Sequence, residues 1–151
     1  MRAPLSIFLL FVSAAPALAE GWSHSASGMG QFEGGFESAG PKSLYLTYSC
    51  SFTASRLSLG VSGLEASPGL ARLLVDGEMI AEEGVIYASR SDITSITIEA
   101  LRDYGQAAMD THNDILRAIA EGTTLIWELP NGTTHEISLE GSAEIASCRF
   151  E

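Results

Sequence analysis

Cysteine is scarce in this sequence of 151 residues, which contains only Cys50 and Cys148. They form no C-x-x-C pair, and the histidines His24, His112 and His135 include no pair at the i, i+4 spacing of an H-E-x-x-H helix. The nucleophile elbow G-x-S-x-G and the phosphate loop G-x-G-x-x-G are also missing. By motif, the sequence therefore predicts no metal, no cofactor and no catalytic residue.

Positive charge is equally scarce. Eight Lys and Arg residues stand against nineteen Asp and Glu, which gives a net charge of −11 at neutral pH. Such a surface repels nucleic acid and anionic lipid headgroups, and it favours cationic partners or simply keeps the protein in solution. No run of five or six acids is present, so a disordered acidic tail is not predicted.

Long hydrophobic runs are absent apart from one short stretch near the start, Leu5 to Val12. It follows Arg2 and precedes the small-x-small sequence that ends at Ala19, which is the pattern of a cleaved secretory signal. The alternative is an uncleaved anchor, but the stretch is too short to cross a hydrocarbon core of roughly 30 Å as a helix. We expect a signal peptide over residues 1–19, cleavage before Glu20, no stable membrane insertion, and a soluble periplasmic or secreted product of net charge −12 once Arg2 is removed.

In an exported chain, two cysteines most often form one disulfide, here between Cys50 and Cys148. The alternatives are two buried free thiols or pairing between two chains. Closing a loop of roughly 100 residues is worth up to ~4.7 kcal/mol in the chain-entropy model, and real bridges often give 2–4 kcal/mol.

Residues 20–42 are rich in Gly and Ser and are predicted to be a flexible N-terminal segment with one irregular strand and no helix. Residues 43–151 are predicted to form the β-rich domain. Residues 44–50 alternate with period two: Leu44, Leu46, Tyr48 and Cys50 share one face, and the residues between them, including Thr47, share the other. Residues 56–64 and 92–100 repeat a strand pattern.

Two dipeptides predict tight hairpins, Asp76-Gly77 and Asn131-Gly132. Helical spacing of apolar residues predicts a middle helix that begins at Ala107 or Asp110 and ends before Gly122. A short terminal helix is predicted over residues 142–148, with Ser142 as its cap and with Ile145 and Cys148 on one face. The fold class is therefore mainly β (α+β): an antiparallel sandwich or curved sheet with a middle helix, a short C-terminal helix and one disulfide.

The candidate functional residues are few. Tyr45, Tyr87 and Tyr104 form a binding face if they lie exposed on the sheet, although packing in the core is the simpler expectation for aromatic residues. His112 and His135 are the candidate bases of an enzyme, and each is more simply explained as a surface residue.

The C-terminal half resembles the invasion-associated locus B family of small exported proteins from alphaproteobacteria. The resemblance covers roughly residues 71–148. It is carried by the segments RLLVDGEMI, AIAEGTTLIWEL and HEISLEGSAEIASC. It implies a sandwich-like periplasmic domain with a disulfide from an early strand to the end of the chain, and it implies no catalytic residue. The Gly-rich start departs from the family pattern.

Three functions are compatible with these features. The first is a non-catalytic binding or accessory protein that contacts a protein or envelope component of the bacterial periplasm. The second is a small periplasmic hydrolase that uses His112 or His135 with nearby acids. The third is an acidic inhibitor of a cationic enzyme such as a lysozyme.

Overall fold

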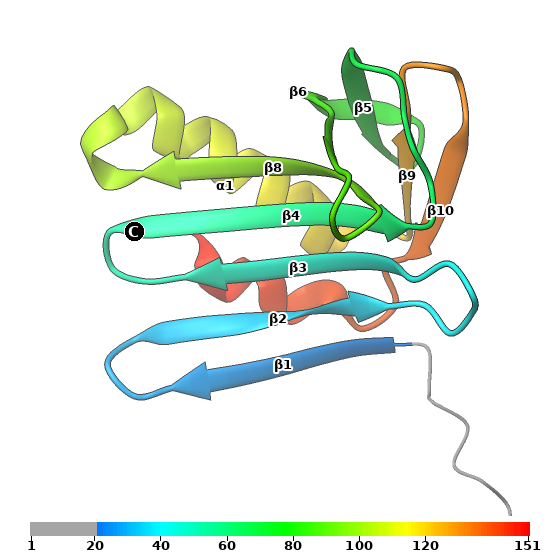
Figure 1. The fold of residues 1–151 in the computed structure, drawn as a ribbon. Helices are drawn as coiled ribbons and strands as arrows, with labels where there is room; N and C mark the ends of the chain where they lie inside the picture. Colours follow the sequence, from blue (N-terminus) through cyan, green and yellow to red (C-terminus); the bar gives the residue numbers. More distant parts are fainter. Residues whose placement is uncertain (1–20) are drawn as a thin grey trace, which may run out of the picture.

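The computed structural model describes residues 21–151, so the predicted signal peptide and its cleavage point lie outside the described residues. The described chain forms two antiparallel sheets (Figure 1). The larger sheet has the strand order β1-β2-β3-β4-β8-β7, and the smaller has the order β10-β9-β5-β6. The strands are β1 (Gly21–Ser27), β2 (Gln31–Glu37), β3 (Leu44–Cys50), β4 (Ala54–Ser62), β5 (Leu70–Val75), β6 (Glu78–Gly84), β7 (Ile86–Ala88), β8 (Ile93–Leu101), β9 (Thr124–Glu128) and β10 (Thr134–Ser138).

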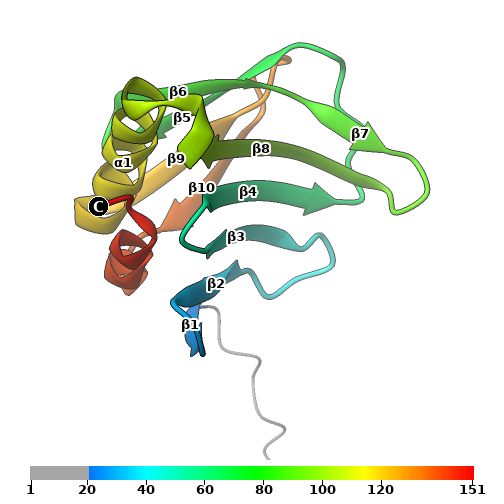
Figure 2. The ribbon, with the colours of Figure 1, turned by 90° about the vertical axis from the view of Figure 1, so that its left-hand side faces the viewer.

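One helix and two short 3-10 helices complete the fold: α1 (Gln106–Glu121), η1 (Arg102–Tyr104) and η2 (Ser142–Cys148). Figures 1 and 2 both place α1 beside η2, on the side of the large sheet that faces the smaller sheet. The predicted fold class, mainly β with antiparallel sheets and a middle helix, is confirmed.

The core lies between the inner face of the large sheet and the elements that cover it. The alternation predicted for residues 44–50 is the reason, because every second residue of β3 and β4 points inward. The fully buried side chains come from both sheets, from α1 and from η2; the largest include Leu46, Leu57, Leu59, Ile96, Leu116, Ile119, Trp127 and Ile145.

The Asp76-Gly77 hairpin is confirmed. Both residues have positive φ, 50° and 89°, as a two-residue type I′ turn requires, and they join β5 to β6. The Asp76 carboxylate also accepts hydrogen bonds from the Thr123 hydroxyl and from the main-chain N–H groups of Thr123 and Thr124, and these bonds lower its pKa. The second hairpin, between β9 and β10, has a longer loop in which Gly132 alone of the predicted pair has positive φ.

The helices follow the predicted positions with two differences. α1 begins at Gln106, close to the earlier predicted start, and ends at Glu121; the N–H of the following cap residue, Gly122, donates to the carbonyl of Ala118. The short C-terminal helix is a 3-10 helix, and Ser142 does not cap it, because Gly141 occupies the cap position and the Ser142 hydroxyl donates to the carbonyl of Ile119 at 2.8 Å. Among the described helices, none combines the length and the apolar character that crossing a membrane requires.

The predicted disulfide between Cys50 and Cys148 is present, with 5.4 Å between the two Cα atoms. It joins the end of β3 to the end of η2, whose residues Ile145 and Cys148 both point into the core, as predicted. The bond therefore fastens the last helical turn to the inner face of the large sheet.

The Gly-rich start differs from the prediction of one irregular strand. Residues 21–37 form two regular strands, and β2 pairs with β3 in the same sheet as the rest of the chain. Gly34 and Gly35 explain the difference, because a Cβ at either position would lie 2.3 Å or less from a main-chain oxygen of a neighbouring strand. These glycines allow the strands to approach closely, rather than loosening the segment.

Candidate functional site

The outer face of the large sheet is polar and carries many hydroxyl groups. Its residues alternate with the buried ones; they are Ser23, Ser25, Glu33, Glu37, Thr47, Ser49, Arg56, Ser58, Thr97 and Glu99. Register places Ser23, Gly35, Thr47, Ser58 and Thr97 in one row across five strands. The face therefore offers small hydroxyl side chains with few bulky groups among them.

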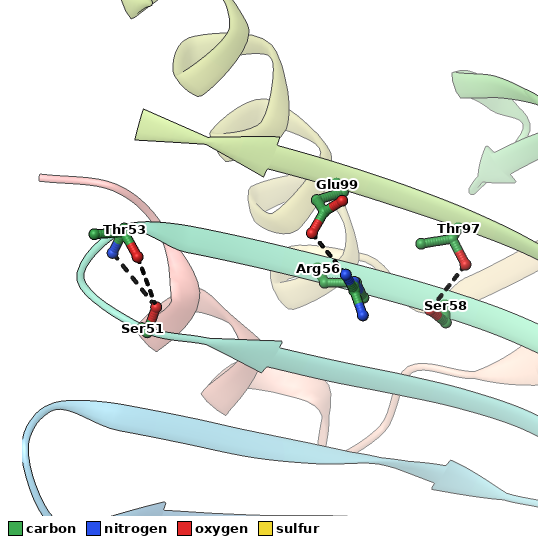
Figure 3. Close-up of polar contacts among 6 residues, drawn as sticks. All are labelled: Ser51, Thr53, Arg56, Ser58, Thr97 and Glu99. Carbon is green, nitrogen blue, oxygen red and sulfur yellow. Dashed lines mark hydrogen bonds and ion pairs between the residues drawn. The ribbon is translucent and has the colours of Figure 1, made fainter. Parts of the chain in front are cut away.

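Polar contacts join the strands across this face (Figure 3). Arg56 and Glu99 form an ion pair at 2.7 Å, and the hydroxyls of Ser58 and Thr97 lie 3.1 Å apart on the same two strands. An exposed ion pair of this kind adds only about 0.2–1 kcal/mol to stability. The Arg56 guanidinium is thus a polar group on the surface and contributes little to stability.

A shallow trough runs along β2 on this outer face, made of three neighbouring hollows. The first, of about 330 Å³, lies over Gly35 beside Tyr45. The second, of about 360 Å³, lies over Gly34, and the third, of about 260 Å³, extends to Arg56. The trough exists because the middle of β2 carries no side chains, and we call this surface the outer-face trough.

Gly34 has a second consequence on the inner side of β1 and β2. It lies between His24 and Tyr48 in the register, and a Cβ there would be 2.6 Å from the Tyr48 hydroxyl. Because Gly34 has no Cβ, the Tyr48 hydroxyl reaches His24 Nδ1 at 2.5 Å. Burial, and secondly the carboxylate of Glu144, raise the pKa of Tyr48, so that the phenol keeps its proton.

Two side chains of β1 attach this strand to the end of β10 and to the loop that follows it. The Trp22 indole N–H donates to the carbonyl of Ser138 at 2.9 Å, and His24 Nε2 lies 2.8 Å from the carbonyl of Gly141. Because a carbonyl oxygen only accepts, His24 Nε2 carries a proton and donates it to Gly141. β1 is therefore held in place by side chains as well as by its pairing with β2.

The three tyrosines predicted to form a binding face do not lie together. Tyr45, on β3, borders the outer-face trough, and its ring occupies the position that a Cβ of Gly60 would take. Tyr87, on β7, pairs with the buried Thr94 and so lies on the opposite face. Tyr104 is exposed in η1, at the end of β8.

His112 is not the surface residue that the sequence suggested. It is only 2% exposed, and its Nε2 lies 2.8 Å from the hydroxyl of Ser55, which is 1% exposed. Phe150 packs against the ring, with the two ring centroids 6.2 Å apart. Burial lowers the pKa of His112. The spacing of Met109, His112 and Leu116 along α1 was the signal that placed this histidine on the buried face.

His135 is also less exposed than predicted. It lies half-buried on β10, with its ring centroid 5.6 Å from that of Trp127. Burial, and secondly the nearby Lys42, lower its pKa. Within residues 21–151, no group of three or more His, Cys, Asp or Glu side chains is arranged to hold a metal ion.

The sequence predicted one strand face that lines the trough, but it did not predict the trough itself. The alternation of residues 44–50 placed Tyr45, Thr47 and Ser49 on one face, and this is the face that lines the trough. The contributions of Ser23 and Glu33 were missed, because they depend on the pairing of β1 and β2.

Comparison of the chain with protein-family models, with curated proteins and with solved structures finds no match in any of the three.

Proposed function

We propose that this chain is an exported, non-catalytic binding or accessory protein, and that it contacts a cationic protein or envelope component through the outer-face trough. The observation that carries the proposal is the trough itself. It is an open, polar surface along β2, bordered by Tyr45 at one end and by Arg56 and Glu99 at the other.

The composition of the trough suits binding rather than chemistry. Hydroxyl groups such as those of Ser23 and Thr47 both donate and accept hydrogen bonds, and the exposed Glu33 adds negative charge. A tyrosine at the rim supplies an apolar ring with a polar tip, which is typical of recognition surfaces. The large negative net charge favours a cationic partner.

The hydrolase alternative is disfavoured by where its histidines lie. A general base must come within hydrogen-bond distance of a substrate proton. His112 and Ser55 are both almost fully buried, and His135 lies half-buried against Trp127 on the smaller sheet. The hollows that form the trough are lined by other residues.

Export is supported by the disulfide between Cys50 and Cys148, since such bonds persist in oxidising compartments outside the cytosol. The signal-like residues 1–19 point the same way. A periplasmic location is also what the resemblance of residues 71–148 to the invasion-associated locus B family implies.

The proposal is tested by site-specific photo-crosslinking in envelope extract, with the full chain in its oxidised form. A photoreactive residue replaces Thr47 in the trough or, as the matched control, Thr134, an exposed threonine on β10. We expect one specific adduct from position 47 and none from position 134, with the adduct lost near 1 M salt, where the Debye length is about 3 Å. The same adduct from both positions, or no adduct from position 47, would contradict the proposal.

A further inference from the structure

The described chain has four edge strands, and three of them carry features that discourage pairing with another strand. β7 has only three residues, β6 contains Glu78, Glu82 and Glu83 and pairs through an irregular register, and β10 carries Glu136. Short edges, charges and bulges are the usual means of protecting a sheet edge. β1 has seven residues, no charged residue, no proline and an unbroken register with β2.

The main-chain groups that β1 presents at this edge follow from the register. In an antiparallel sheet, the main-chain groups of successive residues point to opposite sides of the strand. A residue that hydrogen-bonds to one neighbouring strand is therefore flanked by residues whose main-chain groups point to the other side. The N–H of Ser38 donates to the carbonyl of Leu44, so the even-numbered residues of β2 bond β3 and the odd-numbered ones bond β1.

The β1 partners of those odd-numbered residues include Ser23 and Ser25. The N–H and C=O groups of Trp22, His24 and Ala26 therefore point away from β2, toward an edge beside which residues 21–151 place no further strand (Figure 1). An edge of this kind can accept an extended segment by main-chain hydrogen bonds.

β1 is also held rigidly enough to act as a template. The side chains of Trp22 and His24 form hydrogen bonds with the carbonyls of Ser138 and Gly141, and His24 also forms a hydrogen bond with the Tyr48 hydroxyl. A strand that is already ordered loses little conformational entropy when a partner binds.

The charges around β1 identify the chemistry of the partner. Glu33 and Glu37 project from β2 on the outer face, and Glu136 and Glu140 line a hollow of about 470 Å³ next to Trp22. None of these four carboxylates takes part in an ion pair with another described residue. The sequence from residue 21 to residue 41 contains no Lys or Arg.

We infer that the edge of β1 binds an extended, cationic segment of the partner as an additional strand of the large sheet. Lys or Arg side chains on the outer side of that segment lie over the small Ser23 and Ser25, toward Glu33 and Glu37. The alternate side chains of the bound segment, which project from its inner side, face Trp22. This inference rests on the proposed binding function and specifies its mode.

A second copy of the chain is the less favourable occupant of the same edge. It would pair β1 with an identical β1 and bring the same four carboxylates together, in two molecules that each carry a large negative charge. A cationic strand instead gains attraction from the same groups.

The test uses the Ala26→Pro variant of the full chain, with Ala26→Ser as its matched control. Proline at this position removes an N–H that points to the open edge and leaves the bonds between β1 and β2 in place. The probe is a short peptide that alternates lysine and valine, and binding is followed by the fluorescence of Trp22, since Trp127 is fully buried. A glutamate–valine peptide and an N-methylated lysine–valine peptide serve as negative controls.

We expect the lysine–valine peptide to bind the native chain and Ala26→Ser equally. Binding to Ala26→Pro is expected to be about tenfold weaker, equivalent to about 1.4 kcal/mol. Equal binding to both variants, no binding to the native chain, or equal binding of the N-methylated peptide would overturn the inference. A dimer that Ala26→Pro dissociates would assign the edge to a second copy and would overturn it too. If the Thr47 crosslink persists in any of these cases, the binding function stands and only the edge mode fails.

Discussion

The Tyr48 hydroxyl and His24 Nδ1 lie 2.5 Å apart, on strands that are not neighbours in the sheet. The strand between them carries Gly34 at this position, and the absence of a side chain allows the two groups to meet. One glycine thus connects the N-terminal strand to the core and, on the opposite face, provides the floor of the trough.

Replacing Gly34 by Ala should therefore destabilise the N-terminal hairpin. The added Cβ would lie 2.3 Å from the carbonyl oxygen of Ser23 and would displace Tyr48 from His24. We expect a loss of about 1–3 kcal/mol in the free energy of unfolding, as for other overpacked sites, measured by chemical denaturation. Gly28→Ala is the control, because no atom lies within 4 Å of a Cβ at that position. Equal stability of the two variants would show that β1 and β2 tolerate the change.

The disulfide should contribute a large part of the stability. Its two cysteines are 98 positions apart, and it holds η2 against the large sheet. Replacing Cys50 and Cys148 together by Ser should lower the free energy of unfolding by about 2–4 kcal/mol. Denaturation of the native chain with and without reductant provides a second measurement. A loss that stays well below about 1 kcal/mol in both experiments would mean that packing alone holds η2.

Acid should weaken the fold through His112. Burial lowers its pKa in the folded chain, whereas the unfolded residue has a pKa near 6.5. The stabilising effect of a neutral, buried His112 is complete above the unfolded pKa and is lost as the pH falls toward the folded pKa, because the unfolded chain then binds the additional proton. Burial of His135 has the same sign.

We expect the fall in unfolding free energy between about pH 7 and pH 5 to be shallower in His112→Gln than in the native chain. Ser55→Ala is the control. It leaves His112 Nε2 without its partner, which costs about 1–3 kcal/mol, but the titrating ring remains and the slope with pH should persist. If the unfolding free energy of His112→Gln fell with pH as steeply as that of the native chain, other groups would govern the acid dependence.

Local signals in the sequence predicted much of the fold. The alternation in Leu44–Cys50 gave β3, and Asp76-Gly77 gave the hairpin, because each depends on neighbouring residues alone. The N-terminal hairpin was missed because it depends on residues that are distant in the sequence. Glycine is by itself a poor strand former, and the need for a residue without a Cβ at position 34 arises only when β1 and β3 pack on either side of β2.

The candidate site shows the same limit. Tyr45, Tyr87 and Tyr104 were grouped by residue type, but the pairing of β7 with β8 turns Tyr87 to the inner face. His112 was expected to be a surface residue of the helix, although its spacing from Met109 and Leu116 is that of the buried stripe of α1. In both cases the tertiary structure, through strand pairing or helix packing, determines which side the residue faces.

Hydrogen exchange at single amides of β1 is the most direct measurement of the proposed binding mode. In the free chain, the amides of Trp22, His24 and Ala26 should exchange rapidly, and those of Ser23 and Ser25 should be protected by their bonds to β2. Adding the lysine–valine peptide should protect the first three and leave the other two unchanged. Rapid exchange of all three in the bound state, or protection already present in the free chain, would contradict binding at this edge.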